Sequence, residues 1–232
     1  MGKDTNEIKF YGLQKTTLLD YPGYVACILF TRGCNMRCPF CHNKSLLFNN
    51  DLKTIDVWEY LEKRKGLLDG VVISGGEPLL YDTGETLSII KDMGYKIKLD
   101  TNGSFPDKLE TLIRNDLVDY VAMDIKHEPE KYALATGVDT DMNDIQRSID
   151  LLLTGQVEYE FRTTVVRGIH TEEDMMKLAE WINGTNRYYI QQYRKPEIMV
   201  DLTLSSFSDE EMKRMLKKIQ KVIPNAELRG VE

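Results

Sequence analysis

The chain has 232 residues, 42% of them hydrophobic, so it can bury a full core without disulfides and lies at the upper end of the size of one domain. Its 30 basic and 37 acidic residues give a net charge of -7, which argues against nucleic acid or an anionic membrane as a partner. The longest apolar stretches, such as residues 25–30, are far shorter than the roughly 20 residues that cross a bilayer. Because the polar N-terminus carries no apolar signal core, we expect a cytoplasmic protein. From the chain length we expect a single domain over residues 1–232, with a core over roughly 20–230.

Strand-like and helix-like segments alternate along the chain. Runs rich in apolar and β-branched residues predict strands, and the segments between them carry apolar residues at helical spacing. About six such units imply right-handed crossovers and a parallel sheet with helices outside it, too few for a closed eight-stranded barrel. We therefore predict an α/β fold, a single-domain open partial barrel of parallel βα units. The predicted strands are 24–31, 70–74, 96–100, 120–125, 159–166 and 188–193, with a closing extended piece at 226–229, and the predicted helices are 54–65, 83–93, 106–114, 141–153, 171–182 and 208–222.

Three of the four cysteines, Cys34, Cys38 and Cys41, are spaced by three and two residues in the loop after the first predicted strand. Such crowding suits a metal site in a reducing compartment. A saturated 4Fe-4S cluster takes four thiolates, so three would leave one iron open for a substrate. The alternative is a zinc site with His42 as fourth ligand, although His42 and the adjacent Cys41 would have difficulty reaching one tetrahedral ion. Cys27 stands apart, and we expect it to be a buried strand thiol.

The cysteine motif, with Phe40 before its last cysteine, resembles the signature of the radical S-adenosylmethionine (SAM) superfamily. Residues 74–78, Ser-Gly-Gly-Glu-Pro, are similar to that family's glycine-rich segment. The Asp-Thr-Asn-Gly of residues 100–103 and the Asp-Ile-Lys of residues 124–126 resemble the activating enzymes of glycyl radical enzymes. Within that group, the N-terminal stretch 12–23 and the late Leu-Arg-Gly at 228–230 resemble the anaerobic ribonucleoside-triphosphate reductase activating proteins.

The resemblance implies two cofactors, a 4Fe-4S cluster held by the three cysteines and SAM bound to the open iron. It also implies that a small monovalent cation binds beside SAM, because oxygen ligands suit hard cations. Some related activases carry a histidine at the sixth strand, where this chain has glutamines that cannot transfer protons. The residues implied for SAM are Phe40 near the adenine, Gly75, Gly76 and Glu77 at the methionine end, Lys126 and Arg162 at the carboxylate, Asn102 and Asp124 at the ribose or amino group, and Gln191; those implied for the cation are Asp100, Thr101 and Asp124.

The function implied by the resemblance is an anaerobic oxidoreductase that activates a glycyl radical enzyme. It would cleave SAM reductively to a 5′-deoxyadenosyl radical and install a glycyl radical on anaerobic ribonucleoside-triphosphate reductase, with electrons from a flavodoxin or ferredoxin. The alternatives are a radical SAM enzyme for a small molecule or peptide, a pyruvate formate-lyase-type activase, and a zinc or iron-sulfur module without catalysis. All the segments concerned follow predicted strands, so we expect them to gather at the carboxyl ends of a parallel sheet.

Overall fold

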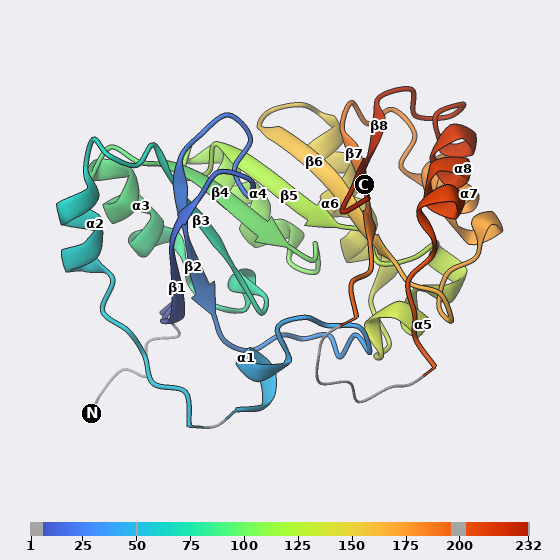
Figure 1. Ribbon diagram of the computed structural model, residues 1–232. Helices are drawn as coiled ribbons and strands as arrows, with labels where there is room; N and C mark the ends of the chain where they lie inside the picture. The colour runs from blue at the N-terminus through green and yellow to red at the C-terminus, as the bar shows by residue number, and fades with distance from the viewer. Residues whose placement is uncertain (1–6, 50, 196–202, 232) are drawn as a thin grey trace.

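The computed structural model describes residues 7–49, 51–195 and 203–231, and one sheet runs through them. Its eight strands lie in sequence order, so each strand is added beside the one before it. The first pair is antiparallel and every later pair is parallel, and the sheet stays open between its first and last strands (Figure 1). The strands are β1 (Phe10–Thr17), β2 (Ala26–Thr31), β3 (Gly70–Gly75), β4 (Lys96–Thr101), β5 (Tyr120–Asp124), β6 (Glu158–Val165), β7 (Tyr188–Gln192) and β8 (Ala226–Arg229).

Helices connect the parallel strands and cover one face of the sheet (Figure 1). This α/β order and the open parallel sheet confirm the predicted fold class. The last two long helices begin with capping boxes, in which the N-cap side chain and the side chain three residues on each accept the other's backbone N–H. The helices are α1 (Lys44–Phe48), α2 (Trp58–Arg64), α3 (Gly84–Asp92), α4 (Pro106–Arg114), α5 (Tyr132–Thr136), α6 (Met142–Leu153), α7 (Glu172–Trp181) and α8 (Asp209–Ile219), with 3₁₀ turns η1 (Pro78–Leu80) and η2 (Pro129–Lys131).

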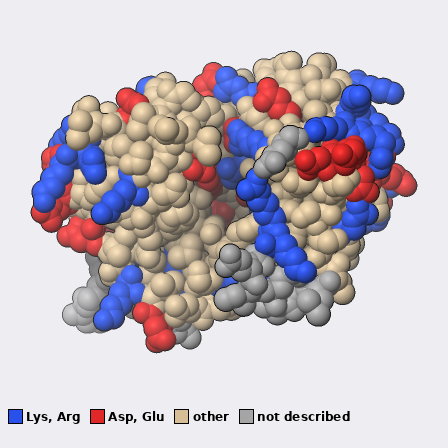
Figure 2. All heavy atoms as spheres, viewed as in Figure 1, with Lys and Arg blue, Asp and Glu red and all other residues tan. Residues whose placement is uncertain are grey.

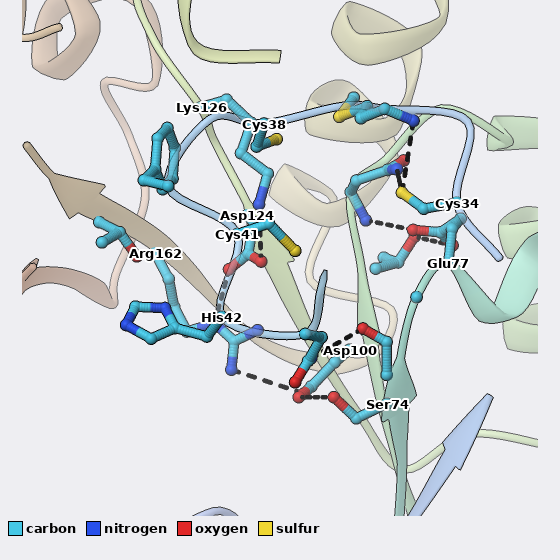
Figure 3. Close-up of a pocket in the computed structure, with 18 of the residues that line it drawn as sticks. Cys34, Cys38, Cys41, His42, Ser74, Glu77, Asp100, Asp124, Lys126 and Arg162 are labelled. Carbon is cyan, nitrogen blue, oxygen red and sulfur yellow. Dashed lines mark hydrogen bonds and ion pairs between the residues drawn. The ribbon is translucent and has the colours of Figure 1, made fainter. Parts of the chain in front are cut away.

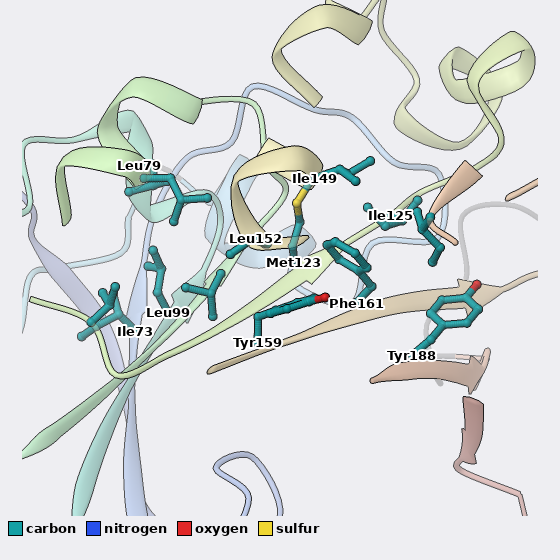
Figure 4. Close-up of a cluster of buried hydrophobic side chains, with 14 of the residues drawn as sticks. Ile73, Leu79, Leu99, Met123, Ile125, Ile149, Leu152, Tyr159, Phe161 and Tyr188 are labelled. Carbon is teal, nitrogen blue, oxygen red and sulfur yellow. The ribbon is translucent and has the colours of Figure 1, made fainter. Parts of the chain in front are cut away.

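The hydrophobic core fills the space between the sheet and the helices (Figure 4). Alternate residues of the central strands point into it, among them Ile73, Leu99 and Phe161, which are fully buried. Each such side chain contributes roughly 1.5–3 kcal/mol through its removal from water. Cys27 also lies in this core, as predicted, and burial raises the pKa of its thiol to about 12.

The residues between those core positions point to the opposite, inner face of the sheet. A small apolar cluster around Tyr21, Val72 and Tyr120 fills its amino-terminal end. Toward the carboxyl end the inner positions become charged, as at Lys98 and Arg162. Side chains alternate in direction along each strand, so the sheet has an apolar face that stabilises the fold and a polar face that can bind a ligand.

The first strand, β1, is the largest departure from the prediction. Its residues are mostly half-buried or exposed, so they lack the apolar run that marks the central strands. β1 forms because its backbone pairs antiparallel with β2, an interaction between distant residues that local composition does not reveal. The sheet also has one more parallel strand than the six main units, since the predicted closing piece pairs with β7 as β8.

The predicted helix over 54–65 is wrong at its beginning. α2 starts only at Trp58, because the amide of Ile55 donates to the carbonyl oxygen of Phe10 at 2.9 Å and holds this stretch against β1. The short helices α1 and α5 were not predicted either, since five residues carry too little periodicity to identify a helix. Within the described ranges, no helix combines the length and the apolar character needed to span a membrane.

Candidate functional site

The carboxyl ends of the parallel strands surround a cavity of about 380 Å³. Its walls come from the loop after β2 and from the ends of β3 to β7, where parallel sheets form their ligand sites. Every residue that the sequence associated with the cluster, SAM or a cation lines this cavity. These residues are Cys34, Cys38, Phe40, Cys41, Gly75, Gly76, Glu77, Asp100, Thr101, Asn102, Asp124, Lys126, Arg162 and Gln191.

The three cysteines of the motif lie on the loop between β2 and α1 and border the cavity (Figure 3). Main-chain contacts hold this loop in place: the amide of Gly33 donates to the carbonyl oxygen of Leu46 at 3.2 Å, and the amide of Arg37 donates to Thr136 at 2.7 Å. The sulfur of Cys34 accepts a hydrogen bond from the backbone two residues on, at 3.3 Å. The thiols are thus presented by a loop whose backbone is already fixed.

The thiols fit a cluster better than a single ion. Among the described residues, no group of three or more His, Cys, Asp or Glu side chains converges on one metal position. A 4Fe-4S cluster needs no such convergence, because each cysteine binds a different iron. His42, the fourth ligand in the zinc alternative, has its Nε2 3.0 Å from the carbonyl oxygen of Arg194, and its ring lies beside Tyr193. The donor set is therefore three thiols, as a cluster with one open iron requires.

Gly75 and Gly76 bring the glycine-rich segment against the backbone of the cysteine loop. A Cβ on Gly75 would lie 2.4 Å from the carbonyl oxygen of Thr31, and one on Gly76 only 1.7 Å from that of Gly33. Gly75 also has a φ of +115°, which side-chain-bearing residues rarely adopt. These positions require glycine because two backbones meet there, beside the first cysteine of the motif.

Glu77 is a buried carboxylate that joins this segment to the loop after β4. Its Oε1 accepts hydrogen bonds from Thr101 Oγ1 at 2.8 Å and the Leu79 amide at 3.1 Å, and its Oε2 accepts one from the Asn102 amide at 2.7 Å. Burial raises the pKa of Glu77 to about 7, while the three hydrogen bonds limit the rise by stabilising the carboxylate. Both oxygens are thus engaged by protein donors.

Asp100, Asp124 and Arg162 form an ionic network across three neighbouring strands (Figure 3). The guanidinium of Arg162 donates from Nε to Asp124 at 2.9 Å and lies 3.5 Å from Asp100, and Lys126 Nζ lies 3.0 Å from the other oxygen of Asp124. Burial alone would raise the pKa of Asp124, but Arg162 and Lys126 lower it to about 2. Despite burial, Asp124 raises the pKa of Lys126, and Asp100 and Asp124 raise the pKa of Arg162, so both aspartates and both basic groups are charged.

The loop after β4 also contacts the cysteine loop through Asn102. Its Nδ2 donates to Asn35 Oδ1 at 2.8 Å and lies 3.7 Å from the sulfur of Cys34. Phe40 is packed edge-on against His170, with ring centroids 6.4 Å apart, and Gln191 accepts a hydrogen bond from a neighbouring hydroxyl at 3.4 Å. These residues hold the walls of the cavity in one arrangement.

Two groups of residues around the site were missed in the sequence. Ser74 donates to Asp100 at 2.9 Å, and Lys98 forms an ion pair with the same carboxylate. The contact of Lys98 could have been found in the sequence, because the alternation of Lys-Ile-Lys-Leu-Asp along β4 puts Lys98 and Asp100 on one face. His127 and His170 stack behind Lys126 with centroids 4.8 Å apart, and His170 Nε2 lies 2.8 Å from the Lys126 carbonyl oxygen.

Comparisons with known proteins agree with this site. The family model described as the Radical SAM superfamily matches residues 28–182. A protein of Methanocaldococcus jannaschii, provisionally named as a glycyl-radical enzyme activating enzyme, is 33% identical over 230 residues, with 95% of each chain covered. The pyruvate formate-lyase-activating enzyme of Clostridium pasteurianum is 25% identical over 236 residues, which cover 92% of this chain and 97% of the relative.

Solved structures share the fold. Streptococcus suis SuiB bound to S-adenosylmethionine superposes with a TM-score of 0.67 at 14% identity, over 85% of this chain and 48% of that one. Native anSMEcpe with bound AdoMet gives a TM-score of 0.62 at 18% identity, over 82% of this chain and 57% of that one. The family's enzymes use a 4Fe-4S cluster and SAM, and the three thiols and the cavity fit both. The chain therefore belongs to the radical SAM superfamily and, within it, to the glycyl-radical enzyme activating enzymes.

Proposed function

We propose that this protein installs a glycyl radical on a partner enzyme, and that the partner is anaerobic ribonucleoside-triphosphate reductase. One observation carries the proposal: the cysteine loop, the glycine-rich segment and the loops after β4 and β5 line a single cavity. The nearly full-length similarity to the Methanocaldococcus jannaschii relative supports a protein substrate.

In this proposal Cys34, Cys38 and Cys41 hold three irons of the cluster and leave the fourth to SAM. When bound, the cluster and SAM supply the radical that removes a hydrogen atom from the glycine Cα of the partner. The chain itself binds, orients and shields the cofactors. Its buried walls, among them Phe40, exclude water from the reacting groups.

The ionic network supplies the charges for SAM. Lys126 and Arg162 present an ammonium and a guanidinium to its carboxylate, while Asp124, with a pKa near 2, stays ionised and can attract its amino group. Asn102 serves the ribose or amino group, Phe40 packs against the adenine, and Gly75 and Gly76 line the methionine end. Gln191 contributes amide hydrogen bonds and no proton transfer.

The partner is suggested by the edges of the sheet. Two segments resemble the reductase activating proteins. Residues 12–23 contain most of β1 and the loop after it, and residues 228–230 contain the end of β8; β1 and β8 are the two edge strands. Leu18 and Leu19, in the loop that joins β1 to β2, are 70% and 88% exposed. The face drawn in Figure 2 is hollowed between the two halves of the molecule. An exposed pair of leucines beside an edge strand suits contact with a protein better than with a small molecule.

The electron donor in this proposal is a flavodoxin or a ferredoxin. Phe48 on α1 is 61% exposed, and the guanidinium of Arg37 on the cysteine loop lies 6.0 Å from its ring centroid. An exposed ring beside a cation next to the cluster loop suits an acidic electron carrier. Because crowded free thiols need a reducing compartment, the proposal places the protein in the cytoplasm.

The first experiment tests SAM cleavage. The protein is reconstituted anaerobically with iron and sulfide, given SAM and a reductant, and assayed for 5′-deoxyadenosine as wild type, Cys38→Ala and Cys27→Ala. We expect cleavage by the wild type and by Cys27→Ala, whose thiol lies in the core, and none by Cys38→Ala. If the wild type carries a full cluster but cleaves no SAM, with or without the partner enzyme, the proposed activity is wrong and the protein only binds its cofactors.

The second experiment identifies the partner. Electron paramagnetic resonance follows glycyl radical formation on anaerobic ribonucleoside-triphosphate reductase and, in parallel, on pyruvate formate-lyase. A doublet on the reductase alone supports the proposal, and a doublet on the lyase alone supports the activase named for the Clostridium pasteurianum relative. Cleavage of SAM without a radical on either protein would favour a small-molecule or peptide substrate.

A further inference from the structure

We infer that the ammonium group of Lys98 is the fixed cation of the SAM site, a positioning residue that takes the place of a bound monovalent metal ion at Asp100, Thr101 and Asp124. This inference rests on the SAM site of the proposed function. It goes beyond that function because it specifies which ions the site needs.

The oxygen atoms that would bind a metal ion already have protein donors. Asp100 Oδ1 pairs with Lys98 Nζ and lies 3.5 Å from Arg162, and its Oδ2 accepts from Ser74 Oγ at 2.9 Å. Asp124 Oδ1 accepts from Arg162 Nε at 2.9 Å, and its Oδ2 pairs with Lys126 Nζ at 3.0 Å.

Thr101 is turned away from the two aspartates. Its hydroxyl donates to Glu77 Oε1 at 2.8 Å and accepts the amide of Gly103 at 3.1 Å. Hard cations require several free oxygen ligands in one place.

Lys98 is built into the site by its strand. Its side chain is only 1% exposed, and β4 is flanked on both sides, with Lys98 in register with Val72 of β3 and Tyr120 of β5. Because residues two apart on a strand share a face, the ammonium reaches the carboxylate of Asp100 along the inner face of the sheet. The neighbouring strands therefore restrict the direction of the Lys98 side chain.

The charge balance of the inner face supports this assignment. Asp100, Asp124 and Glu160 are each paired with lysine or arginine side chains, namely Lys98, Lys126, Arg162 and Arg229. Burial alone would raise the pKa of Asp100, and Arg162 and Lys98 lower it below its ordinary value. The charges of Asp100 and Asp124 are therefore already balanced by protein cations, and Lys98 is one of them.

The test measures SAM affinity of the cluster-loaded protein by anaerobic equilibrium dialysis, in potassium, sodium or choline chloride at constant ionic strength. We expect the wild-type Kd to differ by less than about twofold among the three salts. In Lys98→Met, Asp100 loses the ammonium that pairs with it, so the Kd for SAM should rise about tenfold in choline. Potassium or sodium should restore most of the lost affinity. If an added cation restores the SAM affinity of the variant, the positive charge of Lys98 is what the site needs, because a cation cannot restore a lost packing contact.

Lys96→Met is the matched control, because it makes the same change on the same strand at a side chain that is 47% exposed and paired loosely with Asp119. Its SAM affinity should equal that of the wild type in every salt. Lys98→Gln serves as a second variant if Lys98→Met does not fold, since an amide still donates to Asp100 but carries no charge.

Three results would overturn the inference. The first is a wild type that binds SAM in potassium or sodium and more than about fivefold weaker in choline. The second is a Lys98 variant with wild-type affinity in choline, and the third is a loss that no cation recovers. A wild type that binds no SAM in any salt would overturn the proposed function itself, and this inference with it.

Discussion

The amide of Glu77 donates a hydrogen bond to the carbonyl oxygen of Gly33 at 2.8 Å, so the glycine-rich segment and the cysteine loop share a main-chain contact. Gly33 directly precedes the first cysteine of the motif, and Glu77 holds the loop after β4 through both of its oxygens. The cluster ligands and the walls of the SAM cavity are therefore parts of one rigid arrangement. Changes at any of these contacts should affect both cofactors.

Gly76→Ala should separate the two segments. Its Cβ would lie 1.7 Å from the Gly33 carbonyl oxygen, so one backbone must move, at a cost of at least about 1–3 kcal/mol in the free energy of unfolding. We expect lower iron content after reconstitution and SAM binding weakened about tenfold or more, measured by iron analysis and dialysis. Gly84→Ala is the control, because the nearest atom to its Cβ lies 3.9 Å away. Equal iron content and SAM affinity in both variants would contradict this account.

Glu77→Gln tests the buried carboxylate. Both oxygens of Glu77 accept backbone N–H groups, so an amide must place its own NH2 against one of those donors. An unsatisfied buried donor costs about 1–3 kcal/mol, and we expect a loss of that size in the free energy of unfolding by urea. Glu85→Gln, on the first turn of α3, provides a comparison outside the cavity. The hydrogen-bond argument fails if the two substitutions have the same effect on stability.

Arg162→Gln tests the ionic network. The substitution removes the guanidinium that Asp100 and Asp124 share, and breaking a buried ion pair costs about 3–5 kcal/mol. SAM affinity should fall about tenfold or more in addition, because Arg162 is proposed to meet the SAM carboxylate. Arg147→Gln, an exposed ion pair on α6, should change neither quantity appreciably. Unchanged SAM affinity in Arg162→Gln would remove this residue from the carboxylate site.

Stability should fall in mild acid because of His170. Its Nδ1 accepts the Val166 amide and its Nε2 faces the Lys126 carbonyl oxygen, so the ring is neutral, and burial lowers its pKa from 6.5 to about 4. The unfolded chain binds this proton more readily, so stability is complete above about pH 6.5 and is lost as the pH falls toward 4, by about 2 kcal/mol at pH 5. His170→Phe should be less stable near neutrality but should lose about 2 kcal/mol less between about pH 7 and 5, as urea unfolding at each pH would measure. Parallel pH profiles for the two proteins would refute the prediction.

Local sequence patterns predicted much of the fold and of the candidate site. Apolar runs identify the central strands, and the order of these strands along the chain is also their order in the sheet. The cysteine motif and the segments around Glu77, Asn102 and Lys126 could be assigned to one site from the sequence, since each follows a strand. β1 could not, because its stability comes from pairing with β2 rather than from its own composition.

By itself the sequence determined which residues follow which strand and which of them can bind a cluster or a charged ligand, because such patterns are local in the chain. Only the tertiary structure decided that Gly76 must be a glycine to pass Gly33, and that Arg162 joins two aspartates from neighbouring strands. These relationships depend on strand register, burial and direction across the sheet. Such distances are set when strands pair, and no spacing along the chain records them.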